Sequence, residues 1–208
     1  MTKVLIIDSA ATGDNSVSHK LTAEFAARLL ERDSNAEIVR RDIGADPIPH
    51  LTSATVSAIR GKAETEEGQR TLELSDALIA EIQAADTIVI GAPMYNFGMS
   101  STLKTWFDHV LRAGVTFRYT SEGPEGLVKG KRAIVIETRA GFYSDGPAAL
   151  MDNQEPHIRT LLGFMGIGDV TFIRAEKLAF GPEAASAAMQ DAIAQIDGQA
   201  EQEMALAA

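Results

Sequence analysis

Residues 87–97 read TIVIGAPMYNF, a stretch that joins a continuous apolar run to a loop with two aromatic side chains. The run at 87–92 shows no alternation of apolar and polar residues, which is typical of a strand buried on both faces of a parallel sheet. Residues 93–99 predict a loop, and Ser100 or Ser101 can begin a helix that extends to Arg112. We therefore predict a strand, a loop and a helix in succession around Tyr95.

Units of the same kind lie on both sides of this stretch. Apolar runs predict further strands at 3–8, 132–138 and 170–175, and a weak alternation of apolar and polar residues predicts another at 36–43. Helical spacing of apolar residues predicts helices at 20–32, 72–84, 154–166 and 182–202. Five alternations of strand and helix predict an α/β fold, with a five-stranded parallel sheet and helices on both faces. We expect residues 1–208 to form a single domain.

Three segments between these units lack a clear period. Residues 52–69 are polar and leave the structure open, except that 63–68 (AETEEG) is expected to be a solvated loop. Residues 115–119 and 126–128 flank a turn-rich segment and predict a small hairpin or flap. Residues 139–153 contain Gly141, Gly146 and Pro147 and predict a long loop.

The composition excludes several classes of protein. The chain has 208 residues, a formal net charge of -10 and no cysteine. Nucleic-acid binding requires a basic surface, and thiolate catalysis and iron–sulfur clusters require cysteine, so none of these is expected. The first residues do not form a signal peptide, and no apolar run approaches the roughly 18 residues that a membrane helix needs. We expect a cytoplasmic protein that binds neither nucleic acid nor membrane.

The loop after the first strand carries hydroxyl groups and runs into a helix. It contains Ser9, Ser16 and Ser18, but neither a GxGxxG nor a GK[ST] motif and no Lys or Arg. Ligands of parallel sheets bind beyond the carboxyl ends of the strands, and a helix N-terminus favours a phosphate group there. We predict that neutral donors hold a phosphate in this loop, the alternative being an ordinary serine helix cap.

Two further loops follow strands at the same predicted edge. Met94, Tyr95, Asn96 and Phe97 combine aromatic and amide groups, as a flat ring with one polar edge requires, unless they only fill a domain edge. Small residues in the loop from Thr138 to Gly141 allow a close approach of backbone to a ligand, unless this is a simple loop.

Other polar side chains suggest no catalytic or metal site. The four histidines lack the spacing of metal ligands and are expected on the surface or on a helix face: His19, His50, His109 and His157. Lys104 and Asp108 stand four residues apart and predict a solvated ion pair. Since no acid–base pair stands out, the pattern favours a reaction whose chemistry a cofactor supplies.

These motifs resemble those of the FMN-dependent NADH-azoreductases, also described as NADH:quinone reductases, of the flavodoxin-like fold. The similar stretches are PIPHL at 47–51, LSDALIAEI at 74–82, APMYNF at 92–97, GVTFRYTSEGPEGLVKGK at 114–131, TLLGFMGI at 160–167 and AFGPE at 179–183. The resemblance implies bound FMN, NADH as co-substrate, ping-pong transfer of two electrons to quinones and azo compounds, and a homodimer whose partner chain helps to wall the site.

The resemblance also implies roles for individual residues. The cofactor-binding set comprises Ser9, Ala10, Ser16, Val17, Ser18, Met94, Tyr95, Asn96, Phe97, Thr138, Arg139, Ala140 and Gly141, and the set that lines the substrate comprises Tyr119 and Phe164. The chain departs from the family at Ala10, where a hydroxyl is usual, and at TRAG (138–141), where SRGG is usual. Glu137 precedes that loop and is expected to add negative charge near the flavin.

Two other functions are compatible with the same loops. One is an NAD(P)H:FMN reductase that releases reduced flavin, and the other is a flavodoxin-type carrier of single electrons. A flavin-free regulatory or scaffold protein is a further class, which a colourless purified sample would support.

Overall fold

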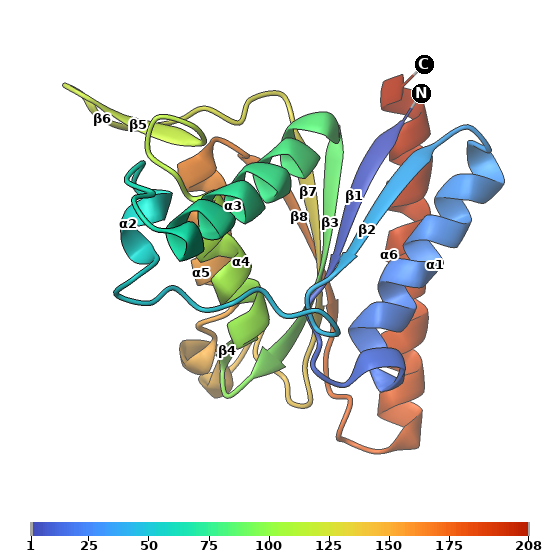
Figure 1. The fold of residues 1–208 in the computed structure, drawn as a ribbon. Coiled ribbons are helices and arrows are strands. Elements are labelled where there is room, and N and C mark those ends of the chain that lie inside the picture. Colours follow the sequence, from blue (N-terminus) through green and yellow to red (C-terminus); the bar gives the residue numbers. More distant parts are fainter. Residues whose placement is uncertain (1, 208) are drawn as a thin grey trace.

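Five parallel strands form the centre of the molecule. The computed structural model describes residues 2–207, and of residues 14, 206 and 207 only the backbone. The strands are β1 (Lys3–Asp8), β2 (Glu37–Asp42), β3 (Thr87–Tyr95), β7 (Arg132–Thr138) and β8 (Asp169–Ala175). They lie in the order β2-β1-β3-β7-β8, and all pair in parallel (Figure 1). The predicted five-stranded parallel sheet is confirmed.

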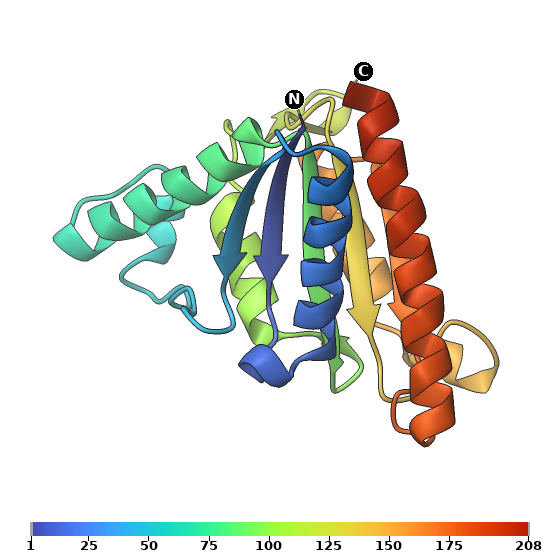
Figure 2. The same cartoon turned by 90° about the vertical axis from the view of Figure 1, so that its right-hand side faces the viewer.

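Helices cover both faces of this sheet. The helices α1 (Val17–Arg32) and α6 (Pro182–Ala207) pack on one face, while α3 (Glu66–Ala84), α4 (Ser101–Val110) and α5 (Glu155–Met165) pack on the other (Figures 1 and 2). Each face has its own apolar core, since strand residues alternate between the two: Leu5 and Ile88 face α3 and α4, whereas Ile6 and Val89 face α1 and α6. Burial on both faces explains why the central strands β1, β3 and β7 contain continuous apolar runs.

The chain reverses its direction of travel across the sheet between β1 and β3. After β1 it adds β2 on one side, and it then returns past β1 to build β3, β7 and β8 on the other. Asp8 at the end of β1 lies beside Gly91 of β3, and Pro93 of β3 lies beside Thr138 of β7. The loops after β1, β3 and β7 therefore leave the sheet at neighbouring positions of its carboxyl edge, where ligands of such folds bind.

Helix starts differ from the prediction because side-chain caps define them. The helix α1 begins at Val17, three residues earlier than predicted, because the hydroxyl of Ser16 accepts the N–H of His19. The helix α3 begins at Glu66, since Thr65 caps it through the N–H of Gly68 and two glutamates occupy its first turn. The prediction of a solvated loop over all of 63–68 is therefore wrong.

Smaller elements fill segments that were predicted to be irregular or were left open. The short helix α2 (Val56–Ile59) lies in the polar stretch, and η1 (Gly13–Asn15) and η2 (Pro147–Met151) are single 3-10 turns. The strands β5 (Phe117–Thr120) and β6 (Gly123–Gly126) form the predicted hairpin with shifted bounds. The loop at 93–99 is more regular than predicted, because β3 continues to Tyr95 and pairs with β4 (Gly98–Met99).

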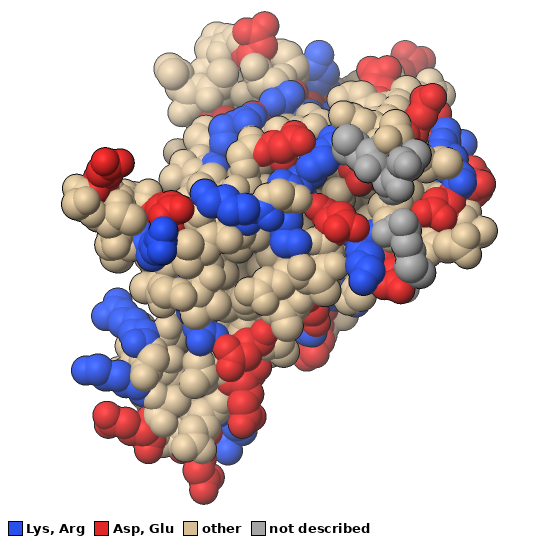
Figure 3. All heavy atoms as spheres, turned by 90° about the horizontal axis from the view of Figure 1, so that it is seen from above, with Lys and Arg blue, Asp and Glu red and all other residues tan. Residues whose placement is uncertain are grey.

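The surface at the amino edge of the sheet mixes both signs of charge. Figure 3 looks onto this edge, where blue Lys and Arg atoms are interspersed with red Asp and Glu atoms and form no continuous basic surface. Among residues 2–207, no helix is long and apolar enough to cross a bilayer.

Candidate active site

The start of α1 presents two hydroxyl groups side by side. The hydroxyl oxygens of Ser16 and Ser18 lie 2.9 Å apart, and both residues are buried. Ser16 is the N-cap of the helix, so its position is fixed by the fold and not by a ligand. The loop thus brings together two polar groups and the positive end of a 16-residue helix dipole.

The other predicted residues of this loop have structural contacts. The hydroxyl of Ser9 donates to the carbonyl of Gly91 at 2.7 Å, so it joins β1 to β3. Ala10 is fully buried, and a Cβ on Gly44 would lie only 2.0 Å from its carbonyl oxygen. The backbone at Ala10 therefore rests directly on the chain that follows β2.

The loops after β1 and β3 are tied together by side chains. The phenol of Tyr95 accepts the N–H of Ala11 at 3.1 Å, and the hydroxyl of Thr102 donates to the carbonyl of Ser9 at 2.6 Å. Thr102 stands in the first turn of α4, which Ser100 caps. The sequence analysis did not identify Thr102, because its partner lies 93 residues away and no local motif marks it.

The loop after β3 is a tight turn in an unusual conformation. Tyr95 pairs with Gly98, and the two residues between them have positive φ angles, 48° for Asn96 and 70° for Phe97. This is the pattern of a type I′ hairpin turn, which Asn tolerates but which costs a residue such as phenylalanine about 1–3 kcal/mol. The ring of Phe97 is 40% exposed and meets Tyr143 edge to face, with centroids 6.0 Å apart. Strain of this kind persists only where the surrounding structure holds it, and it is concentrated at functional sites in proteins.

The loop after β7 exposes backbone but buries its charged side chain. Carbonyl groups of Arg139, Ala140 and Gly141 accept N–H groups from residues 177–179, which fixes the path of the chain. A Cβ at Gly141 would lie 2.8–2.9 Å from the ring of Tyr143. Thr138 is buried, and the guanidinium of Arg139 is completely buried among acidic groups.

Glu137 is part of that buried group, with no exposed surface. Burial raises the pKa of Glu137 to about 8, although the guanidinium of Arg139 acts in the opposite direction. Burial therefore disfavours the negative charge that the sequence analysis expects at Glu137.

Tyr119 and Phe164 lie away from these loops. Tyr119 is 73% exposed on β5, and Phe164 packs against Phe117 with centroids 4.6 Å apart. The hairpin β5–β6 projects near the amino edge of the sheet, whereas the loops after β1, β3 and β7 gather at the carboxyl edge (Figure 1). Within one chain, the structure does not bring the two predicted substrate-lining residues to the predicted cofactor loops.

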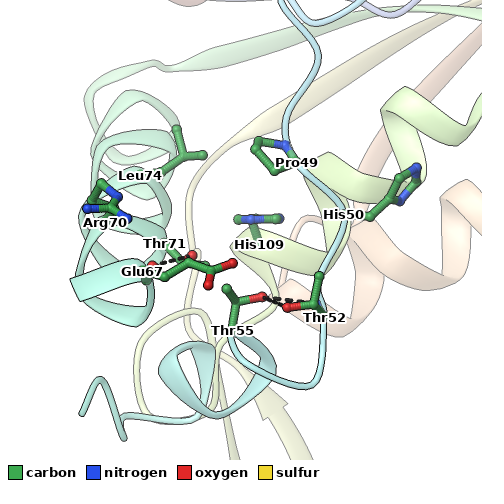
Figure 4. A pocket seen from close by; sticks show the side chains of 9 residues that line it. All are labelled: Pro49, His50, Thr52, Thr55, Glu67, Arg70, Thr71, Leu74 and His109. Carbon is green, nitrogen blue, oxygen red and sulfur yellow. Dashed lines mark hydrogen bonds between the residues drawn. The ribbon is translucent and has the colours of Figure 1, made fainter. Parts of the chain in front are cut away.

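Two hollows lie on the face that α3 and α4 cover. One has a volume of about 550 Å³ beside the hairpin, and its lining includes Leu51, Ile59, Phe117 and Tyr119. The other, of about 330 Å³, is drawn in Figure 4, where the ring of His109 stands among residues of α3 and of the segment 49–55. Neither hollow includes a predicted cofactor-binding residue.

His19 and His109 lie on helices α1 and α4, as the prediction of a helix-face position allows, but on the buried faces of these helices. His19 and His109 are buried, with 9% and 1% of their surface exposed. Burial lowers the pKa of His109, whose Nδ1 lies 3.0 Å from the carbonyl of Thr105. No cluster of three or more metal-ligating side chains occurs in the part of the chain that the structure describes. The predicted pair of Lys104 and Asp108 is confirmed at 2.5 Å.

The sheet order, the hydroxyl-bearing helix start and the aromatic turn define a flavodoxin-like α/β protein. A family model described as the flavodoxin-like fold matches residues 2–200. The chain is 52% identical over 196 residues to the FMN-dependent NADH:quinone oxidoreductase of Hyphomonas neptunium, with 94% of each chain covered. It is 50% identical over 199 residues to the protein of the same name from Escherichia coli K12, with 95% and 98% covered.

Solved structures agree with these sequence relationships. An azoreductase from Bacillus anthracis superposes with a TM-score of 0.88 at 28% identity, with 97% of this chain and 100% of that chain covered. An FMN-dependent NADH-azoreductase from the same species, solved in complex with FMN, gives the same TM-score and identity, with 97% and 99% covered. The chain belongs to the flavodoxin-like family of FMN-dependent NADH:quinone oxidoreductases and azoreductases.

Proposed function

We propose that the protein binds FMN and transfers two electrons from NADH to quinones and azo compounds. The observation that carries this proposal is the start of α1, where Ser16 and Ser18 place two buried hydroxyls at a helix N-terminus without any Lys or Arg in the loop. This donor set fits a phosphate monoester. The names of the relatives, which share about half of their residues with this chain, supply the reaction.

The residues of the site bind and orient, whereas bound FMN would supply the redox chemistry. We propose that Ser16, Val17 and Ser18 hold the phosphate through hydroxyl and N–H groups. Met94 to Phe97 form one wall of the ring site, and their strained turn fixes the position of the Phe97 ring. Thr138 to Gly141 approach the ring with backbone, because Ala140 is exposed and Gly141 carries no side chain.

The site predicts that donor and acceptor bind in turn at one place. The sequence carries no second nucleotide-binding motif, so NADH and quinone would use the same open side of the site. We expect initial rates with both substrates varied to give parallel double-reciprocal lines. Lines that intersect at all concentrations would contradict a single shared site.

Retention of the flavin distinguishes this function from its two alternatives. If FMN stays with the protein during gel filtration, an enzyme that releases reduced FMN is excluded. Rapid reduction of the bound flavin by NADH, followed by reoxidation with a quinone in an anaerobic stopped-flow experiment, separates the enzyme from a single-electron carrier.

We also propose a homodimer in which each chain completes the site of its partner. Tyr119 and Phe164 lie far from the cofactor loops of their own chain, so they can line that site only if a second copy supplies them. The exposed aromatic ring of Tyr119 and the apolar hollow beside it suit such a contact.

The dimer makes activity depend on protein concentration. We expect light scattering to show a dimer, and Tyr119→Ala to raise the KM for quinone more than it changes FMN affinity. A fully active monomer at nanomolar concentration would refute this assembly.

We also propose a cytoplasmic location, because NADH is supplied in the cytoplasm. Recovery of the native protein from an extracytoplasmic fraction would contradict this location.

A further inference from the structure

The guanidinium of Arg139 is the centre of a buried ionic cluster beneath the proposed FMN site. It is fully buried and has four partners. The distances are 2.6 Å to Glu137, 3.0 Å to Asp152, 3.1 Å to Glu176 and 3.2 Å to the side-chain oxygen of Gln154. A long polar side chain buried this completely, directly after β7, can bind no ligand itself.

The partners of Arg139 connect it to the other loops of the site. Gln154 donates its amide N–H to the carbonyl of Ala92, within β3, at 2.8 Å, and the adjacent Asn153 donates its backbone N–H to the carbonyl of Phe97, in the turn after β3, at 3.0 Å. Asp152 accepts the N–H groups of Gln154 and Glu155 at the start of α5. Glu176, just after β8, accepts the N–H of Tyr143 in the loop after β7. One guanidinium therefore holds three loops in a fixed relation.

The charges in this cluster do not balance. Three carboxyl groups, those of Glu137, Asp152 and Glu176, share one arginine. Arg174 lies 3.8 Å from Glu137 but is bound to Glu155 at 2.5 Å, and Glu155 also binds Arg159 at 2.8 Å. With these residues included, four carboxyl groups still face three arginines. An excess of buried negative charge is costly, and a carboxyl group removes it by taking up a proton.

Glu137 is the member that can carry this proton. Its Oε2 accepts from Arg139, whereas its Oε1 is buried without a hydrogen-bond partner among the described residues. Burial opposes ionisation of Glu176 too, but hydrogen bonds from Ser144 and Tyr143 hold its pKa below the usual value. The pKa of Glu137, in contrast, is raised to about 8 by burial and by the nearby Glu155, against the effect of Arg139.

We propose that Arg139 is a positioning residue that locks the loops after β3, β7 and β8 together, and that a proton on Glu137 is required for this lock. The proposal rests on the FMN site proposed above, because the loops after β3 and β7 form two walls of that site. When Glu137 loses this proton, its carboxylate adds a negative charge to the cluster that Arg139 cannot compensate. The loops then become less firmly held, although no residue in contact with FMN has itself changed its charge.

The proton has a defined effect on stability. An ordinary glutamate ionises near pH 4.5, whereas folded Glu137 ionises near pH 8. Between these values the native state binds one more proton than the unfolded chain, so stability falls as pH rises, and the fall ends above pH 8. This group alone raises the equilibrium constant for unfolding about tenfold per pH unit.

Glu137→Gln tests the proposal, because glutamine imitates the protonated acid and leaves the fold intact. Urea unfolding of the apo-protein is measured from pH 6 to 9.5, with Glu31→Gln, exposed on α1, as the matched control. We expect the unfolding constant of the parent, divided by that of Glu137→Gln, to rise about fiftyfold from pH 6 to 8 and to level off at about a hundredfold by pH 9.5. The same ratio for Glu31→Gln stays flat.

Titration with FMN tests the positioning role. The parent is expected to bind FMN about tenfold more weakly at pH 9 than at pH 6.5, because only the protonated fraction holds the site. Glu137→Gln keeps its affinity over this range, and Arg139→Lys weakens FMN binding at both pH values. Two results would overturn this inference while leaving the proposed function standing. One is an unfolding ratio that does not change with pH, and the other is a Glu137→Gln protein that also binds FMN tenfold more weakly at pH 9 than at pH 6.5. A parent protein that binds no FMN at any pH overturns the proposed function, and the positioning role with it.

Discussion

Ser16→Asp is expected to weaken FMN binding by more than about 150-fold while leaving the stability of the apo-protein unchanged. A hydrogen bond to a charged group contributes roughly 1.5–3 kcal/mol, which corresponds to about 10- to 150-fold in affinity. Aspartate removes the hydroxyl donor and also adds a negative charge beside the phosphate, so the loss exceeds that range. The loop supplies no Lys or Arg to compensate.

The structure explains why this substitution separates binding from folding. Ser16 caps α1 by accepting the N–H of His19, and aspartate is as good a cap as serine. Ser16→Ala, in contrast, loses the cap at a cost of about 0.5–2 kcal/mol as well as a phosphate contact. Ser18→Ala is expected to weaken FMN by about 10- to 150-fold.

The measurement is quenching of flavin fluorescence on titration of apo-protein, with thermal unfolding of the same samples. Unchanged FMN affinity in Ser16→Asp would show that the phosphate does not bind at the start of α1. Unfolding at a much lower temperature in Ser16→Asp would show that the cap, and not the charge, accounts for the effect.

Gly44→Ala is expected to lower both stability and FMN affinity, although Gly44 is not a predicted site residue. A Cβ there would lie 2.0 Å from the carbonyl oxygen of Ala10, a backbone atom that cannot rotate away. Gly44 is also held by its own N–H, which donates to Asp42 at 2.9 Å. The loop after β1 must therefore move, at a cost of about 1–3 kcal/mol. Its displacement removes at least one phosphate contact, or about tenfold in affinity.

Gly198→Ala is the matched control for this substitution. Gly198 lies exposed in α6, and a Cβ there meets no atom within 4 Å. Alanine is favoured over glycine in a helix by about 1 kcal/mol, so the same change should raise stability at this site. A Gly44→Ala protein as stable as the parent, with normal FMN affinity, would show that the contact between the two loops is not needed.

The sequence predicts the sheet well because its central strands β1, β3 and β7 are buried on both faces. The runs at 88–92 and 133–136 contain no polar residue, as is typical of a central parallel strand. Helix starts are harder to predict, since they depend on caps: Thr65 and the two glutamates after it resemble a solvated loop until the hydrogen bond to Gly68 is known.

The positions of the loops that form the proposed cofactor site follow from the sheet topology, whereas the buried contacts that support these loops do not. Once the strands are placed, their carboxyl edge must carry the loops with Ser16 and Phe97. The partners of Arg139 lie 15 and 37 residues further along the chain, at Gln154 and Glu176, and no local spacing connects them. Glu137 shows the same difficulty, because the protonation of a carboxyl group depends on its burial and on neighbours from several elements.

The left-handed conformation of Phe97 bears on how this protein can evolve. Glycine or asparagine adopts the φ angle of 70° more readily than phenylalanine, so the fold does not depend on an aromatic ring at this position. Replacement of Phe97 by glycine or asparagine would therefore change the shape of the proposed site without a large penalty in folding. Arg139, in contrast, is hard to replace. Its loss removes the cation that Glu137, Asp152 and Glu176 share, so a substitution at residue 139 is tolerated only if several of these partners change with it.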